Sequence, residues 1–236
     1  MKCRSILAVT LLVAASLALT GRAAQADYAA GLAAYDGGDL ALAVSEWRSS
    51  ANAGDTRAQT ALGNAYSSGL HVAVNHRLAS DWYLKAAQNG NADAQYSLAS
   101  SYATGLGVER DLAEAIKWFR AAAENGEVRA QFELAERYAS GAGVRQDQML
   151  ATRWFRAAAD QGHVFAQITV AERYEKGQGG QANPVDAYTW YYIVSQRDET
   201  FARQVAQPLG RIENVLSRDD LILAREQAES WLKNNI

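Results

Sequence analysis

Residue types that commonly carry out catalysis or bind metals are sparse in this sequence of 236 residues. Its three histidines are His71, His76 and His163, and its single cysteine is Cys3. His71 and His76 lie five residues apart in one predicted loop, with no acidic residue at helical spacing, and no HExxH pattern occurs. A zinc site needs a tighter set of nitrogen, sulfur or carboxylate ligands. We therefore expect solvated loop histidines, no metal and no cofactor.

Patterns that indicate a nucleophile or a phosphate-binding loop are also missing. No Gly-x-Ser-x-Gly or Ser-x-x-Lys sequence is present. The glycine-rich stretches at 105–107 and 177–180 follow predicted helices, whereas a phosphate-binding loop follows a strand. Acidic pairs such as Glu133 and Glu136 lie on a predicted helix surface, where a solvated carboxylate is the default. The sequence therefore favours a protein that is not an enzyme.

Small and aromatic residues recur along the chain at a fixed step of 36 residues. Self-similarity at a period of this length is typical of an array of stacked helical repeats. Four copies agree without an insertion, through the glycines Gly54, Gly90, Gly126 and Gly162, the Ala-Gln pairs that begin at Ala58, Ala94, Ala130 and Ala166, the tyrosines Tyr66, Tyr102, Tyr138 and Tyr174, and the tryptophans Trp82, Trp118, Trp154 and Trp190.

The first half of the copy at 91–126 predicts a short helix. Ala94, Leu98 and Tyr102 are spaced by four residues and so share one helix face. The glycines at 105 and 107 then allow the positive φ angles that a helix exit and a tight loop require. The sequence therefore predicts a helix that ends just before this loop.

The second half of the same copy predicts another helix. Asp111 is suited to cap its N-terminus, and Glu114 would complete a capping box. Trp118 and Phe119 lie on its apolar stripe and need a recess, which alanines on neighbouring helices provide. One hairpin cannot cover these rings from both sides, so we expect Trp118 to be buried in a core shared by stacked hairpins. The corresponding caps in the other copies are Asn75, Asp147 and Asn183.

The combined pattern is Ala-Gln-x-x-Leu-x-x-x-Tyr-x-x-Gly-x-Gly-Val-x-x-Asp-x-x-x-Ala-x-x-Trp-Phe-x-x-Ala-Ala-x-x-Gly. It resembles the Sel1-like repeat, a relative of the tetratricopeptide repeat, in its exported bacterial type, and the resemblance covers Asp55 to about Arg197. It implies an all-α fold, a right-handed α-solenoid of stacked helix-turn-helix repeats. The sequence departs from the pattern at His71, which replaces a loop glycine, and in the fourth copy, which has Gly179-Gly180 in place of Gly-Val.

The expected organisation has seven segments. They are a signal peptide at 1–26, an N-terminal tetratricopeptide-like repeat at 27–54, repeats at 55–90, 91–126, 127–162 and 163–197, and a C-terminal helical cap at 198–236.

The first 26 residues have the features of a secretory signal peptide. Lys2 and Arg4 precede an apolar run at 6–19, and an Ala-x-Ala site ends at Ala26. The run is short for a membrane span, although an uncleaved anchor is the alternative. Cleavage after Ala26 predicts a periplasmic or secreted protein.

The chain that remains after cleavage has no cysteine, so it has no disulfide and no thiolate site. Loss of three basic residues leaves 20 basic and 26 acidic residues, a net charge of −6. Nucleic-acid binding requires basic stripes, so we expect no nucleic-acid partner. No later apolar run reaches spanning length.

The last 40 residues or so no longer follow the repeat pattern. About 40 residues is too little to form a core alone, which argues against a separate domain. We expect them to cap the array with a polar outer face. Pro208 is expected to end or kink a helix there, and Ser217 to Asp220 resembles the start of a final helix.

The positions that vary between copies indicate a binding surface. In tetratricopeptide-like arrays the first helix of each repeat lines the concave groove, and the resemblance places the same face here. Aromatic residues beside arginine dominate binding energy at many interfaces. The alternative is that Tyr96 and Phe132 pack between adjacent first helices. The predicted lining comprises Arg57, Asn64, Asp93, Tyr96, Ser100, Arg129, Phe132, Glu136, Phe165, Ile168 and Glu172.

We therefore predict a non-catalytic periplasmic or secreted scaffold that binds a segment of another protein in its concave groove. The resemblance implies partners such as a cell-envelope enzyme or the sensor domain of a membrane kinase. The alternatives are a periplasmic regulator of such a kinase, as an inhibitor or sensor subunit, and an envelope-binding accessory factor for peptidoglycan enzymes.

Overall fold

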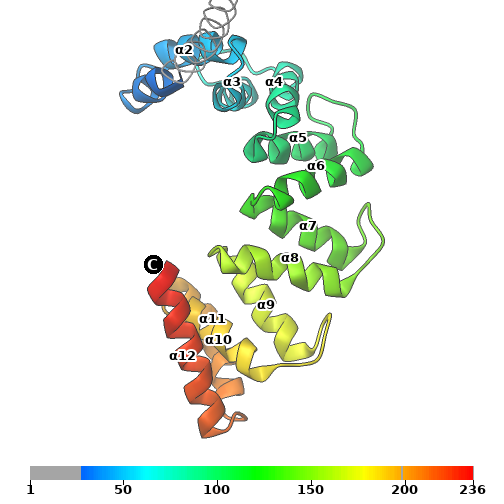
Figure 1. Ribbon diagram of the computed structural model, residues 1–236, viewed down its shortest axis with the longest axis vertical. Helices are drawn as coiled ribbons and strands as arrows, with labels where there is room; N and C mark the ends of the chain where they lie inside the picture. Colours follow the sequence, from blue (N-terminus) through cyan, green and yellow to red (C-terminus); the bar gives the residue numbers. More distant parts are fainter. Residues whose placement is uncertain (1–27, 198, 236) are drawn as a thin grey trace, which may run out of the picture. The chain divides into compact units, whose positions relative to one another are not determined.

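The computed structural model describes residues 28–197 and 199–235, so the predicted signal peptide lies outside the described residues. Within these two ranges the secondary structure is helical and contains no strand (Figure 1). The all-α fold of stacked hairpins is confirmed. After a helix at 28–36 come α2 (Leu40–Asn52), α3 (Thr56–Ser68), α4 (His76–Gln88), α5 (Ala92–Thr104), α6 (Leu112–Glu124), α7 (Val128–Ser140), α8 (Gln148–Asp160), α9 (Val164–Lys176), α10 (Pro184–Ser195), α11 (Glu199–Glu213) and α12 (Arg218–Asn235).

The chain forms two compact units, one of the described residues up to Trp118 and one from Phe119 onward. In unit 1, α2 packs on α3, α3 on α4 and α4 on α5. In unit 2, α7 to α10 pack in the same sequential way. Each unit therefore has the side-by-side packing that the repeat predicts.

The predicted caps of the second helices are confirmed, with one correction. The side-chain oxygens of Asn75, Asp147 and Asn183 each accept a hydrogen bond from the third residue that follows. Asp111 caps α6 in the same way. Glu114, however, does not complete a capping box, because its carboxylate binds Lys117 at 3.1 Å. The Asp111 N–H donates instead to the carbonyl of Tyr102.

The loop between the two helices of a repeat lies against the helix start of the preceding repeat. Gly107 has φ +80°, and a Cβ atom built on it would lie 2.1 Å from the carbonyl oxygen of His76 in α4. His71, at the matching loop position of the first repeat, has φ 51° and is the one non-glycine residue with positive φ in the described chain. A left-handed conformation alone therefore does not require glycine at this position, whereas the close approach at Gly107 does.

The core is built around an aromatic ring on each second helix, one residue after the recurring tryptophan. Tyr83 is 5% exposed in unit 1. Its ring fits over Gly63, where a Cβ would lie 2.6 Å from Cε1 of Tyr83. The corresponding rings in unit 2, all buried, are Phe119, Phe155 and Tyr191.

The recurring tryptophans are less uniformly buried than the sequence predicts. Trp82 and Trp190 are core residues. Trp118 is only partly buried and packs against the edge of the cluster around Tyr83 and Leu98. The expectation that Trp118 is fully buried is therefore wrong: in α6 Phe119 is buried and Trp118 lies at the edge of the core, whereas in α4 and α10 both adjacent aromatic residues are buried.

The recurring Ala-Gln pair has a structural role that its sequence pattern does not reveal. The side-chain amide of each glutamine is buried and donates to the carbonyl of an alanine eight residues earlier, in the last turn of the preceding helix. This bond adds a second donor to a carbonyl that already accepts the N–H of the glycine three residues later, and it ties the end of one helix to the start of the next. The pairs are Gln59 with Ala51, Gln95 with Ala87, Gln131 with Ala123 and Gln167 with Ala159.

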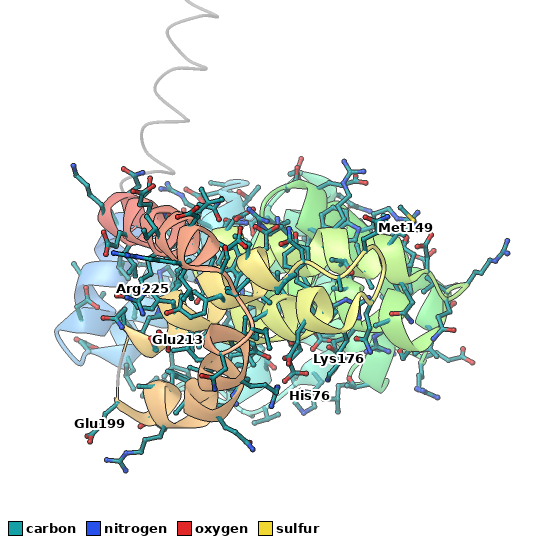
Figure 2. The ribbon with its side chains drawn as sticks, turned by 90° about the horizontal axis from the view of Figure 1, so that it is seen from below. His76, Met149, Lys176, Glu199, Glu213 and Arg225 are labelled. Carbon is teal, nitrogen blue, oxygen red and sulfur yellow. The ribbon has the colours of Figure 1, made fainter. Side chains whose placement is uncertain are left out.

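The C-terminal helices α11 and α12 both pack on α10. The predicted N-terminal cap of α12 is confirmed, since Ser217 Oγ accepts from the N–H of Asp220. Pro208 does not end its helix, and α11 continues through it to Glu213. Proline removes one helical N–H, and the carbonyl that loses it belongs to the exposed residue Gln204. Figure 2 labels the ion pair between Arg225 of α12 and Glu213, which are 2.6 Å apart.

Candidate functional site

The three histidines occupy three different positions in the fold. His71 is an exposed loop residue, His76 is the first residue of α4, and His163 caps α9. His163 Nδ1 accepts the N–H of Ala166 at 3.1 Å, and burial lowers the pKa of the imidazole. Among the described residues no group of three or more histidine, cysteine or acidic side chains could hold a metal ion.

In unit 1 the predicted lining residues divide into surface charges and pocket residues. Arg57 is exposed and binds Asp55 at 3.1 Å, which raises the pKa of its guanidinium. Asp93 is also exposed. Asn64 accepts the hydroxyl of Tyr83 at 2.8 Å, so it helps to position a core ring.

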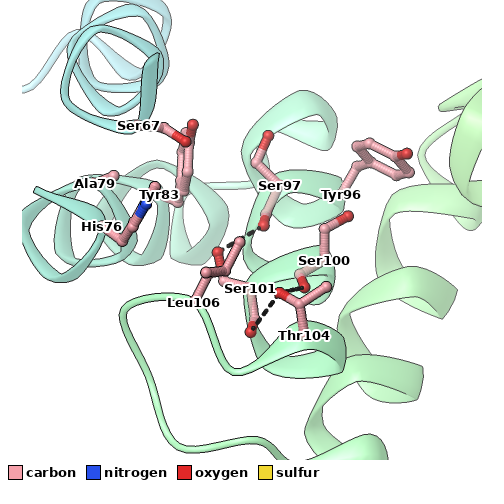
Figure 3. Close-up of a pocket in the computed structure, with 10 residues that line it drawn as sticks. All are labelled: Ser67, His76, Ala79, Tyr83, Tyr96, Ser97, Ser100, Ser101, Thr104 and Leu106. Atoms are coloured by element: carbon pink, nitrogen blue, oxygen red, sulfur yellow. Dashed lines mark hydrogen bonds between the residues drawn. The ribbon is translucent and has the colours of Figure 1, made fainter. Parts of the chain in front are cut away.

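Tyr96 and Ser100, the other two predicted residues of unit 1, line a pocket of about 220 Å³. Figure 3 shows this pocket between α3, α4 and α5, with Tyr83 on one side and the serines of α5 on the other. Ser101 Oγ donates to the carbonyl of Ser97, and Thr104 Oγ1 donates to that of Ser100. We call it the serine pocket, and it is lined by Ser67, His76, Ala79, Tyr83, Tyr96, Ser97, Ser100, Ser101, Thr104 and Leu106.

In unit 2 two predicted residues, Phe132 and Phe165, belong to one aromatic cluster. The ring centroid of Phe132 lies 4.6 Å from that of His163, with the two rings tilted by 30°, and the centroid of His163 lies 6.2 Å from that of Phe165. Phe165 in turn meets Phe201 of α11 at 6.2 Å, edge to face. Phe165 is 57% exposed. We call Phe132, His163, Phe165 and Phe201 the aromatic patch.

The remaining predicted residues of unit 2 are charged surface residues, with one exception. Arg129 lies 2.6 Å from Glu127, and Glu172 lies 3.4 Å from Lys176. Glu136 is exposed. Ile168, however, is 8% exposed and belongs to the core. Its prediction as a lining residue is wrong, because this position of α9 faces inward.

One buried polar residue of unit 2 was not anticipated from the sequence. Arg173 is 5% exposed, and burial lowers the pKa of its guanidinium. Its Nε donates to Thr152 Oγ1 at 2.8 Å, and Nη2 donates to both the carbonyl and the side-chain oxygen of Gln148. Arginine at one variable position of a repeat carries no signal of burial, since its partners lie more than 20 residues earlier in the chain.

Comparison with protein families identifies the repeat. The Sel1 repeat family model matches residues 56–91, 92–127, 128–163 and 164–193, more than half of the chain. No curated protein sequence matches the chain.

Several solved structures share the fold. A protective antigen from uropathogenic Escherichia coli with an SLR fold is 30% identical, with a TM-score of 0.74 over 89% of this chain and 45% of that one. The chain therefore spans less than half the length of that antigen. A Sel1 repeat protein from Oxalobacter formigenes is 25% identical, with a TM-score of 0.73 over 86% of this chain and 84% of that one. A Sel1 repeat protein from Klebsiella pneumoniae subsp. pneumoniae, 22% identical, has a TM-score of 0.51 over 83% of this chain and 96% of that one.

Sel1 repeat proteins generally act as scaffolds for protein–protein interaction. Among the described helices of this chain, none combines the length and the apolar character that crossing a membrane requires. The four family-model matches, together with the stacked hairpins that the structure contains, place the chain in the Sel1 repeat family.

Proposed function

We propose that the protein is a non-catalytic periplasmic or secreted scaffold that binds a segment of another protein on the faces of its first repeat helices, which line its concave groove. The aromatic patch of unit 2 carries this proposal. Phe165 leaves 57% of its surface exposed while its ring contacts Phe201 and His163. An exposed phenylalanine held by neighbouring rings loses little conformational freedom when a partner covers it.

The groups around the patch favour a peptide or protein ligand. Glu172 and Lys176 follow Phe165 along α9, and both are exposed. An apolar centre with a charged rim is the usual composition of a protein interface. A partner segment would therefore place an apolar side chain on Phe165 and polar groups over the rim.

The envelope location rests on the N-terminal sequence. A basic start, an apolar run and the Ala-x-Ala site support export and cleavage after Ala26. The intact mass of the protein recovered from the periplasm or medium tests this, and the mass of a chain that begins at Asp27 is expected. A protein of full-length mass in the membrane fraction would contradict it.

Site-specific photo-crosslinking tests the binding surface. A benzoylphenylalanine at Phe165 is expected to yield a discrete adduct with one envelope protein in cells. The same probe at Val215 or Met149, each 73% exposed, is the matched control and is expected to yield none. Adducts of the same mass at all three positions, or no adduct at 165, would exclude the aromatic patch as the binding surface.

A second measurement separates binding from folding. Replacing Phe165 with serine removes an exposed ring, so the melting temperature should stay close to that of the wild type while capture of the crosslinked partner falls. Unchanged capture by this variant would contradict the proposal.

A further inference from the structure

The serine pocket of unit 1 has a counterpart in unit 2, and in that counterpart an arginine side chain fills the space. The two sites are separated by two steps of the 36-residue repeat. Ser101 of α5 thus corresponds to Arg173 of α9, a buried residue. The other corresponding pairs are His76 with Gln148, Ser80 with Thr152, Tyr83 with Phe155, and Leu106 with Gln178.

The backbone around the two sites is the same. In unit 1, Ser80 Oγ donates to the carbonyl of Leu106 at 3.3 Å, which joins the loop to α4. In unit 2, Thr152 Oγ1 donates to the carbonyl of Gln178 at 3.0 Å. The loop glycine is pressed against the helix start in both, with Cβ approaches of 2.1 Å at Gly107 and 2.2 Å at Gly179. What differs is therefore the side chain that fills the site.

In unit 2 the guanidinium of Arg173 uses three kinds of contact. It donates to the hydroxyl of Thr152 and to the carbonyl and amide oxygens of Gln148. Its Cζ lies 5.6 Å from the centre of the Phe155 ring. These contacts define what a guanidinium requires at this place, namely oxygen acceptors on one side and an aromatic face on the other.

The serine pocket of unit 1 offers two of these contacts, a backbone carbonyl and an aromatic face, with no arginine of its own. The amide oxygen of Gln148 has no counterpart there, because His76 stands at that position. The carbonyl of His76 occupies the place of the Gln148 carbonyl, and the ring of Tyr83 occupies that of Phe155. Ser101 is short, and Ser97, one helical turn before it on α5, also lines the pocket (Figure 3). The volume of about 220 Å³ is left in the pocket because these side chains are small.

The electrostatics of the pocket also favour a cation. None of its lining residues is lysine or arginine. Ser67 and Thr104 belong to the last turns of α3 and α5, and helix C-termini carry partial negative charge. The N-terminus of α4 at His76 opposes this, as the N-terminus of α8 does beside Arg173. The exposed carboxylate of Asp93 is close enough to act on the hydroxyl of Tyr83.

We propose that the serine pocket binds an arginine side chain of the partner protein, in the position that Arg173 takes within unit 2. The proposal rests on the scaffold function and specifies one contact of the bound segment. The guanidinium would donate to the carbonyl of His76 and to the serine hydroxyls, with its face towards Tyr83.

Titration of amide resonances in a nuclear magnetic resonance spectrum tests this without knowledge of the partner. The probe is the tripeptide Gly-Arg-Gly, acetylated and amidated so that the guanidinium is its only charge. We expect saturable shifts of the amides of Ser97, Ser100 and Leu106. The same peptide with citrulline keeps the shape and loses the charge, and it should bind roughly ten-fold more weakly or worse. Equal shifts with both peptides, or none with either, would overturn the proposal.

Two variants of Ser101 provide the matched comparison. Ser101→Arg is expected to fold, to fill the pocket as Arg173 does, and to abolish the shifts. Ser101→Ala leaves the pocket open and should bind the arginine peptide within a few-fold of the wild type. A Ser101→Arg chain that fails to fold, or that still binds the peptide, would show that the two sites are not equivalent and would end the proposal.

The outcomes separate this inference from the scaffold function. If a partner crosslinks at Phe165 and the arginine peptide leaves the serine pocket unshifted, the scaffold stands and the arginine contact is refuted. If the peptide binds and no partner crosslinks, the pocket chemistry stands and the proposed binding surface of unit 2 is refuted.

Discussion

The loop glycine at 107 offers a stringent test of how the hairpins pack, through Gly107→Ala. The new methyl group would lie 2.1 Å from the carbonyl oxygen of His76 and 2.8 Å from the N–H nitrogen of Arg77, both backbone atoms of the first turn of α4. Neither can move aside as a flexible side chain could. The loop would have to withdraw from α4, which would stretch the bond from Ser80 to the carbonyl of Leu106.

Gly90→Ala is the matched control in the same unit. Gly90 has φ +82°, nearly the φ of Gly107, but a Cβ there would meet nothing within 4 Å. Both variants bear the left-handed strain of about 1–2 kcal/mol. Gly107→Ala adds the backbone clash and the weakened hydrogen bond, about 2 kcal/mol more. Because about 1 kcal/mol lowers the melting temperature by about 2–4 °C in a chain of this size, the two variants should melt about 4–8 °C apart.

Thermal unfolding followed by circular dichroism at 222 nm measures this difference, and urea unfolding checks it at constant temperature. Equal destabilisation by Gly107→Ala and Gly90→Ala would mean that backbone strain alone explains the glycine. The close contact between loop and α4 would then contribute nothing, and the account of how successive hairpins pack would fail.

Three further perturbations address the helix cap His163, the buried glutamines of the Ala-Gln pairs and the core ring Phe155. Burial lowers the folded-state pKa of His163, so protonation of its imidazole opposes folding. The contribution of His163 to the free energy of unfolding should be fully present above about pH 6.5 and should fall as the pH drops below that value. His163→Asn keeps a capping side chain and should flatten this dependence in denaturant unfolding between about pH 7 and 5. Gln131→Met should cost about 1–3 kcal/mol in urea unfolding, since it breaks bonds at both ends of the amide; Gln167→Met should cost less, because the Oε1 atom of Gln167 has no hydrogen-bond partner. Phe155→Ala, at 1% exposure, should cost about 3–5 kcal/mol by the same measurement, and a wild-type melt would exclude this ring from the core.

The helix boundaries were predictable because their signals are local. A capping side chain such as Asn75 and a left-handed glycine such as Gly105 act within a few residues of the helix end. Repetition at a fixed step then multiplies a weak signal. Pro208 shows the limit of such reasoning, since proline disfavours a helix interior by only about 3 kcal/mol and the packing of α11 on α10 outweighs it.

Which aromatic residue enters the core was harder to predict. Trp118 and Phe119 are adjacent, and of this pair Phe119 is buried and Trp118 is only partly buried, whereas both members of Trp82-Tyr83 and of Trp190-Tyr191 are buried. The choice depends on the recess that the neighbouring helix provides. Gly63 beneath Tyr83 shows that this recess is as specific as the ring that fills it. Gly63 and Tyr83 belong to the same repeat but lie 20 residues apart, on α3 and α4, so no pattern within one helix links them.

The candidate site was predicted in part. Its location on the first helices follows from the resemblance, and Tyr96, Ser100 and Phe132 do line pockets there. Whether such a pocket is open depends on side chains from other helices. The burial of Arg173, for example, requires acceptors on α8, and no pattern within α9 indicates them.

On the proposal above, the residue at the position of Ser101 decides whether the arginine site of a repeat is open or filled. The same position is occupied by Arg137 in the next repeat, where the guanidinium lies 3.7 Å from Glu133 and 5.8 Å from the centre of the Phe119 ring. Arg173 occupies the following site and is 5% exposed there. Scaffold residues recur because each hairpin must pack on the next, so they cannot also distinguish one partner from another. Discrimination has to come from a position where a change of side chain opens or closes a site without altering the backbone, and the serine-to-arginine difference between α5 and α9 meets that requirement.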